Sequence, residues 1–173
     1  MLLKLMGSVF LLFAGTMFGF YQAMQYARRP KQIRQLIGVI QRLETEVSYG
    51  LTPLPDALLT VSRQSAEPIS GMLSRAGTEL RARDGRSMRE IWEGVIGETW
   101  NRSSMKKVEK EITLELGYML GRSDSTDQVK HLRLAASQLQ VEEAAALEDQ
   151  RRYEKMWRSL GVLVGALAVI LMY

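Results

Sequence analysis

Hydrophobic and polar positions follow a helical period through most of the chain. After residue 30, apolar side chains recur every three or four positions, at Ile33, Leu36, Ile37, Ile40, Leu43 and Val47. This spacing places them on one face of a helix. The same period returns in shorter segments that begin near residues 54, 69, 88 and 104. No segment alternates as a half-buried strand does, so the sequence predicts an all-α fold.

Turn and cap residues set the expected limits of these helices. Pro30 suits the first turn of a helix, and Gly50 suits a position just past its end. Asp84-Gly85 is typical of a turn. Ser87, followed three residues later by Glu90, predicts a capping box that opens the next helix.

The last predicted helix is long, because no Gly or Pro interrupts the chain between Ser125 and Gly161. Its apolar positions form a near-heptad stripe that Glu143 and Gln150 interrupt. The members of the stripe are Val129, Leu132, Ala136, Leu139, Ala146, Tyr153 and Trp157. We expect a helix of roughly 45 residues that leaves a bundle and continues into the C-terminal segment.

Both ends of the chain are apolar and uncharged. After Lys4 no charge appears until Arg28, which exceeds the roughly 20 residues of a spanning helix. A cleaved signal peptide is the alternative there, but large or polar residues such as Tyr21, Gln22 and Tyr26 occupy the stretch where a small-x-small site would precede a polar mature start. The uncharged tail, Ser159–Tyr173, is shorter, about 22 Å of helix against a hydrocarbon core of roughly 30 Å. A helix lying in the interface is the alternative for the tail, which lacks the charged face such helices need.

Basic residues crowd beside both apolar ends. They are Arg28, Arg29, Lys31 and Arg34, and then Arg151, Arg152, Lys155 and Arg158. This placement assigns the net charge of +4 to membrane topology and headgroup contact rather than to nucleic-acid binding. The positive-inside rule then puts both termini outside the cytoplasm. We expect an N-terminal transmembrane anchor at residues 1–28, a cytoplasmic bundle of about six helices at 29–158, and a C-terminal transmembrane anchor at 159–173.

Each predicted anchor contains a G-x-x-x-G motif, Gly15 with Gly19 and Gly161 with Gly165. Such spacing lets helix backbones approach closely in a membrane. The motifs are candidates for packing with each other, with a second copy or with another protein. Glycine is also common in membrane helices, so an incidental occurrence is the remaining alternative.

The residues offer little chemistry. The chain has no cysteine and one histidine, which excludes disulfides and cysteine-based metal sites. No glycine-rich phosphate loop or nucleophile elbow is present. Glu109, Glu111 and Glu115 alternate with lysines and are typical of a solvated helix face. We expect no catalytic residue, no metal and no cofactor, and therefore not an enzyme.

Three stretches carry a resemblance to a known family. They are RPKQIRQLIGVIQRLETEVSYGLTPLPDAL (Arg29–Leu58), LELGYMLGRSDSTDQVKHL (Leu114–Leu132) and RRYEKMWRSLGVLVGALAVILM (Arg151–Met172). Over essentially its whole length the chain resembles the stage III sporulation protein AB family of endospore-forming bacteria. More distantly, its central part is similar to the helical domain of the type II secretion and type IV pilus platform protein. Leu116-Gly117 stands where the platform pattern has Gly-Glu, so no acidic residue is carried over there.

This resemblance implies a non-catalytic platform component of a sporulation channel complex, in the mother-cell membrane around the forespore. It would couple a co-encoded cytoplasmic ATPase, stage III sporulation protein AA, to the membrane assembly. Other channel components, membrane lipids and further copies of the chain in a homo-oligomer are the other expected partners, with no nucleic acid. The platform-like stretches supply a candidate partner or packing surface of Tyr49, Gly50, Gly117, Gly121 and Asp124. A membrane-tethered adaptor or regulator is the alternative function.

Overall fold

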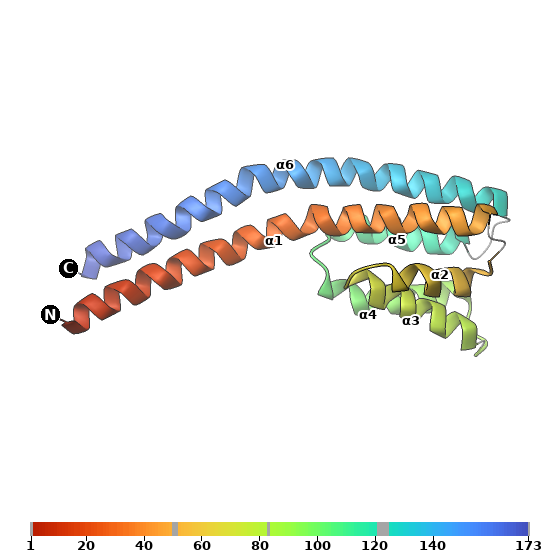
Figure 1. The fold of residues 1–173 in the computed structure, drawn as a ribbon, viewed down its shortest axis with the longest axis horizontal. Helices are drawn as coiled ribbons and strands as arrows, with labels where there is room; N and C mark the ends of the chain where they lie inside the picture. Colours follow the sequence, from red (N-terminus) through yellow and green to blue (C-terminus); the bar gives the residue numbers. More distant parts are fainter. Residues whose placement is uncertain (1, 50–51, 83, 121–124, 173) are drawn as a thin grey trace. The chain divides into compact units, whose positions relative to one another are not determined.

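The computed structural model describes residues 2–49, 52–82, 84–120 and 125–172, apart from some side chains near the two ends. Its elements are α1 (Leu2–Tyr49), α2 (Leu54–Arg63), α3 (Ile69–Ala82), α4 (Met88–Thr99), the 3-10 helix η1 (Trp100–Arg102), α5 (Lys107–Leu120) and α6 (Ser125–Met172) (Figure 1). No strand occurs in these ranges, so the predicted all-α fold is confirmed. The chain divides into two units. The terminal unit is Met1–Pro30 with Ala144–Tyr173, and the central unit is Lys31–Glu143.

The first helix differs from its prediction, because Pro30 lies inside α1 rather than at the start of a new helix. An interior proline removes one backbone hydrogen bond and crowds the preceding turn, at a cost of about 3 kcal/mol. Arg29 and Pro30 are both buried, and Arg29 forms an ion pair with Asp149 of α6. Packing of this turn therefore offsets the cost of the proline and keeps the helix continuous.

The last helix has the predicted form. It runs without a break from Ser125 to Met172, and its stripe is buried at Leu132, Leu139 and Ala146, each at most 1% exposed. Glu143, which interrupts the stripe, accepts a 2.6 Å contact from Nε of Arg34. The acidic interruption is thus explained by an arginine on α1.

The terminal unit holds α1 and α6 together through side chains far apart in sequence. The rings of Tyr26 and Tyr153 stack with centroids 5.2 Å apart, and Arg29 contacts Asp149 at 3.2 Å. Large apolar side chains are exposed on both helices, namely Phe13, Met17, Tyr21, Met24, Met156, Leu160, Leu163, Val164, Leu167 and Ile170. Among the described residues, no helix has the length and apolar character needed to cross a bilayer.

The core of the central unit forms around the apolar stripe of α1. All six predicted positions from Ile33 to Val47 are buried, with at most 8% exposed. Ion pairs flank this core, and one of them joins Nε of Arg133 on α6 to Glu44 on α1 at 2.7 Å. Burial of apolar surface supplies most of the stabilisation here, since such partly exposed ion pairs contribute roughly 0–1 kcal/mol each.

Helices α2, α3 and α4 follow the sequence prediction closely. Ser87 Oγ accepts a hydrogen bond from the Glu90 N–H (3.3 Å), and Glu90 Oε2 accepts one from the Ser87 N–H (2.7 Å). The capping box is therefore confirmed. Gly85 has φ of 91°, a left-handed conformation that suits glycine in the predicted turn. Trp92 and Trp100, both on the apolar side of this segment, are buried.

Helix α5 is rotated relative to its prediction. A helix that begins near residue 104 with its apolar side chains facing inward would bury Val108 and Met119, but they are 46% and 37% exposed, whereas Glu109 and Thr113 are buried. Glu109 is the third residue of the helix and accepts the Lys106 N–H at 2.7 Å, which satisfies one of the free donors at the helix start. The prediction of a solvated Glu109 was wrong, because this bond makes a buried carboxylate tolerable.

A close approach between α4 and α5 fixes that rotation. The Trp92 indole N–H donates to the Thr113 carbonyl at 2.8 Å. One turn further on, a Cβ added to Gly117 would lie 2.1 Å from Cδ1 of Trp92. No side chain fits at such a distance, so the indole occupies the space that the glycine leaves.

Replacing Gly117 with alanine is expected to lower the free energy of unfolding by about 1–3 kcal/mol, because the methyl group overpacks this contact. Urea denaturation of the full chain in detergent, followed by tryptophan fluorescence, measures the change. Gly94→Ala is the control, because no atom lies within 4 Å of its added Cβ. That change should stabilise α4 by up to about 1 kcal/mol through helix propensity. Equal effects of the two substitutions would contradict the packing role of Gly117.

Candidate functional site

The basic residues predicted to face lipid headgroups fall into two groups. Arg29 and Arg34 pair across the helices with Asp149 and Glu143, and Arg29 is 7% exposed. Arg34 stays 70% exposed in its pair, and Arg28, Lys31, Arg151, Arg152 and Lys155 are exposed as well. The side chain of Arg158 lies outside the described residues. Of the described basic side chains in this set, only Arg29 is thus withdrawn from solvent.

The glycine motifs are described in part. All four glycines lie within helices, Gly15 and Gly19 in α1 and Gly161 and Gly165 in α6. Of these, only the burial of Gly15 is among the described features. Gly15 is half-buried, and its spacing of 11 residues from Tyr26 puts both on one face of α1. Because Tyr26 stacks on Tyr153 of α6, this favours packing of the first motif within the chain.

The predicted partner or packing surface separates into two environments. Tyr49, at the end of α1, is 86% exposed and is free to meet a partner. Gly117 is buried against Trp92, so it serves packing. Gly50, Gly121 and Asp124 lie outside the described residues.

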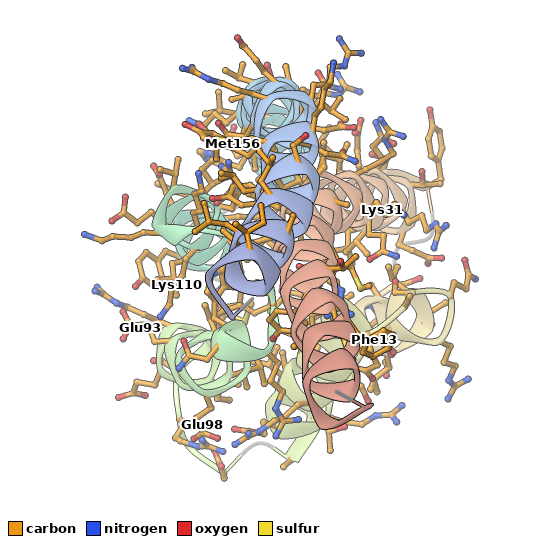
Figure 2. All side chains as sticks on the ribbon, turned by 90° about the vertical axis from the view of Figure 1, so that its left-hand side faces the viewer. Phe13, Lys31, Glu93, Glu98, Lys110 and Met156 are labelled. Atoms are coloured by element: carbon orange, nitrogen blue, oxygen red, sulfur yellow. The ribbon has the colours of Figure 1, made fainter. Side chains whose placement is uncertain are left out.

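Among the described residues, a cluster of five charged side chains lies on α3, α4 and the turn between them. We call it the α3–α4 charge network, and its members are Glu98, Arg75, Glu79, Arg86 and Asp84. Arg75 contacts Glu98 at 2.6 Å and Glu79 at 2.9 Å, and Arg86 contacts Glu79 at 2.9 Å and Asp84 at 2.6 Å. Glu98, with 64% of its side chain exposed, lies on the outside of α4 (Figure 2).

The network keeps its groups charged. The hydrogen bond from Arg75 lowers the pKa of the Glu79 carboxyl, and the bond from Arg86 lowers the pKa of Asp84. In return, Glu98 raises the pKa of Arg75 above its ordinary range. At neutral pH the surface is therefore an alternating array of charges, and ordered charges of this kind steer and select protein partners.

A second cluster joins α4 to α5. The Tyr118 hydroxyl donates to the Glu93 carboxylate, and Nε of Arg89 donates to the same carboxylate at 3.0 Å. The Arg89 guanidinium lies 4.5 Å from the centre of the Tyr118 ring, a cation–π distance. The bond to Glu93 raises the pKa of Tyr118, so this tyrosine stays protonated. Glu93 lies on α4, and its side chain points outward from that helix (Figure 2).

A pocket of about 180 Å³ lies between the start of α3 and the end of α4. Arg75, Glu98 and Arg102 line it together with Glu67 and Gly71. Within the described ranges no group of three or more His, Cys, Asp or Glu side chains is arranged to hold a metal ion. Two arginines and two glutamates are thus among the residues that line the pocket.

Part of this surface was visible in the sequence. The pairs Arg75–Glu79 and Arg89–Glu93 have the four-residue spacing that places charges side by side on a helix. Sequence reasoning missed them, and it also missed Glu98 and Tyr118. Glu98 meets Arg75 because α3 packs on α4, and Tyr118 meets Arg89 because α4 packs on α5. The spacing of residues along one helix does not predict such contacts between helices.

The comparisons with known proteins agree with one another. The model of the family described as stage III sporulation protein AB matches residues 4–173. The chain belongs to this family. Stage III sporulation protein AB of Bacillus subtilis (strain 168) is 40% identical over 171 residues, which is 99% of each chain. A solved structure of stage III sporulation protein AB has 37% identity and a TM-score of 0.67, and covers 72% of this chain and 98% of its own.

Family membership confirms the resemblance and gives a role in spore formation. The family description names a sporulation protein and no reaction. The match extends almost from end to end, so it includes both apolar segments as well as the central unit. The solved relative shares the helical fold over most of the chain.

Glu79→Gln is expected to lower stability at pH 7 by up to about 1 kcal/mol, the range of partly exposed ion pairs. The folded pKa of Glu79 is depressed below its ordinary 4.5, so this stabilisation is fully present above pH 4.5 and is lost as the pH falls through the folded pKa. Urea denaturation between pH 3 and pH 7 tests this. The difference between wild type and variant should shrink in acid.

Glu111→Gln is the control for this prediction. Glu111 forms a looser 3.4 Å pair with Lys107, and 62% of its side chain is exposed. A loss as large as that of Glu79→Gln, or a Glu79 effect that does not change with pH, would contradict the stabilising role of the network.

Proposed function

We propose that the chain is a non-catalytic membrane platform of a secretion-like sporulation complex, with its central unit receiving a cytoplasmic ATPase. The observation that carries the proposal is family membership over nearly the whole chain. The resemblance of the central stretches to the secretion platform domain supports the same role. The partner implied by that resemblance is stage III sporulation protein AA.

Membrane attachment through the two ends is part of the proposal. No charged residue lies between Lys4 and Arg28 or after Arg158. Placing a charge in the centre of a spanning helix costs roughly 2.5–3.5 kcal/mol on insertion scales, and both segments avoid that cost. Exposed side chains such as Phe13 (69%), Leu163 (63%) and Ile170 (73%) support contact with lipid. The mother-cell membrane around the forespore is the proposed location.

The α3–α4 charge network is the proposed contact for the ATPase. Its charges are held by mutual hydrogen bonds, so little side-chain entropy remains to be lost when a partner binds. Glu98 at one end and Asp84 at the other present carboxylates to solvent, with side chains 64% and 39% exposed. A partner with a basic surface would complement these ends.

Binding of the ATPase to the full chain in lipid nanodiscs is expected to be saturable and to depend on nucleotide. Reversing both ends of the network, with Asp84→Lys and Glu98→Lys, should weaken binding by roughly tenfold, about 1.4 kcal/mol. Calorimetry with and without nucleotide measures the effect. Glu111→Lys with Glu115→Lys is the control, since both side chains are exposed on α5.

No saturable binding by the wild-type chain would contradict the platform and leave the adaptor role. Equal weakening by the two charge reversals would contradict the network as the contact surface.

The proposed topology predicts opposite labelling of the centre and the tail. The chain has no cysteine, so single cysteines report without background. Thr60→Cys, at an exposed position of α2, should resist an impermeant maleimide in intact cells and react after lysis. Tyr173→Cys should react in intact non-sporulating cells that express the chain, where the outer face of the membrane is open to the reagent. Labelling of position 60 in intact cells would overturn the orientation.

A further inference from the structure

We propose that the terminal unit binds anionic phospholipid headgroups through Arg28 of α1 and Arg151, Arg152 and Lys155 of α6. We call these residues the basic collar. This inference rests on the proposed membrane attachment and adds the class of lipid. All members of the collar are exposed.

The pairing of the two helices brings the collar to one level. Tyr26 stacks on Tyr153, and Arg29 contacts Asp149. The residue number of the contact rises on α1 while it falls on α6, so the two helices run antiparallel. Arg28 therefore lies at the level of residues 150–152 of α6. The positions from 151 to 155 span one turn, about 6 Å at 1.5 Å per residue. Residues separated by more than 120 positions in sequence thus form a single band.

Among the described side chains, which do not include that of Glu154, no ion pair joins a cation of the collar to an acid. Asp149 is engaged by Arg29. Among the described side chains, Arg28 contacts the Met24 sulfur at 3.4 Å, and the Arg152 guanidinium lies 5.7 Å from the Tyr153 ring. Neither contact removes positive charge. Six basic and three acidic residues occupy positions 28–30 and 144–158, so the band is strongly positive.

The surface changes character on the side of the collar toward the chain ends. On α1, Met24, Tyr21 and Met17 are 49–65% exposed, and on α6, Met156 and Leu160 are 41% and 40% exposed. Figure 2 shows the side chains of Phe13 and Met156 directed outward from their helices. A positive band beside an exposed apolar band on both helices is the pattern of a protein at the boundary between headgroups and acyl chains.

The donors of the collar fit phosphate chemistry. An arginine guanidinium presents paired N–H groups that match two oxygens of a phosphodiester. The long side chains of Arg and Lys also keep their charge at the headgroup level while their stems cover apolar surface. A lipid with net negative charge, such as phosphatidylglycerol, neutralises the positive charge of the collar. Phosphatidylcholine is zwitterionic and has no net charge with which to do so.

Lipid selectivity of the full chain tests the collar. The chain is reconstituted in phosphatidylcholine vesicles, and electron paramagnetic resonance of spin-labelled lipids measures the association of phosphatidylglycerol relative to phosphatidylcholine. We expect a preference of roughly twofold or more at low salt that falls in 1 M NaCl. The variant Arg28→Gln, Arg151→Gln, Arg152→Gln, Lys155→Gln should bring the ratio close to one.

The control removes the same number of charges from the central unit, with Arg63→Gln, Arg102→Gln, Lys107→Gln and Lys110→Gln. It should keep the wild-type preference. A wild-type ratio of one, a collar variant that keeps the preference, or a control that loses it would each overturn the collar and favour an acidic protein segment as the partner of these residues. Release of the wild-type chain from vesicles by alkaline carbonate would instead overturn membrane attachment itself.

Discussion

Burial of one face of α1 is the constraint on which the central unit depends. The apolar stripe from Ile33 to Val47 is almost fully buried, and ion pairs to α6 flank it without replacing it. Burying a Leu or Ile side chain contributes roughly 1.5–3 kcal/mol, more than the flanking pairs of arginine and carboxylate supply. Once this face is covered, the polar surface of the unit is free to carry function.

The sequence predicted the parts of this fold that local patterns encode. The capping box at Ser87 and the turn at Gly85 were correct because each rests on residues within one helical turn, and the unbroken α6 was correct because no Gly or Pro lies between Ser125 and Gly161. The predictions of a helix start at Pro30 and of a solvated Glu109 were wrong. At both sites packing against another helix overrides the local preference. A buried turn tolerates the proline, and a backbone N–H satisfies the buried carboxylate.

The candidate site was less predictable than the fold, because it consists of surface charge shared between helices. Arg75 and Glu79 are neighbours by spacing, but Glu98 joins them only through the packing of α3 on α4. The same holds for Gly117, whose need to be glycine comes from Trp92 on another helix. Residues whose role is set by a distant partner leave little trace in a single sequence.

The contact between Arg29 and Asp149 joins positions 120 residues apart, and this separation has a consequence for biosynthesis. The ribosome covers the most recently made residues of a growing chain, and helices that need distant partners wait for them. Asp149 follows Arg29 by 120 residues, so the ribosome must add all of these residues before this contact can form. In the central unit, Glu143 pairs with Arg34 and precedes Asp149 by only six residues, so the long-range contacts of both units form late in translation.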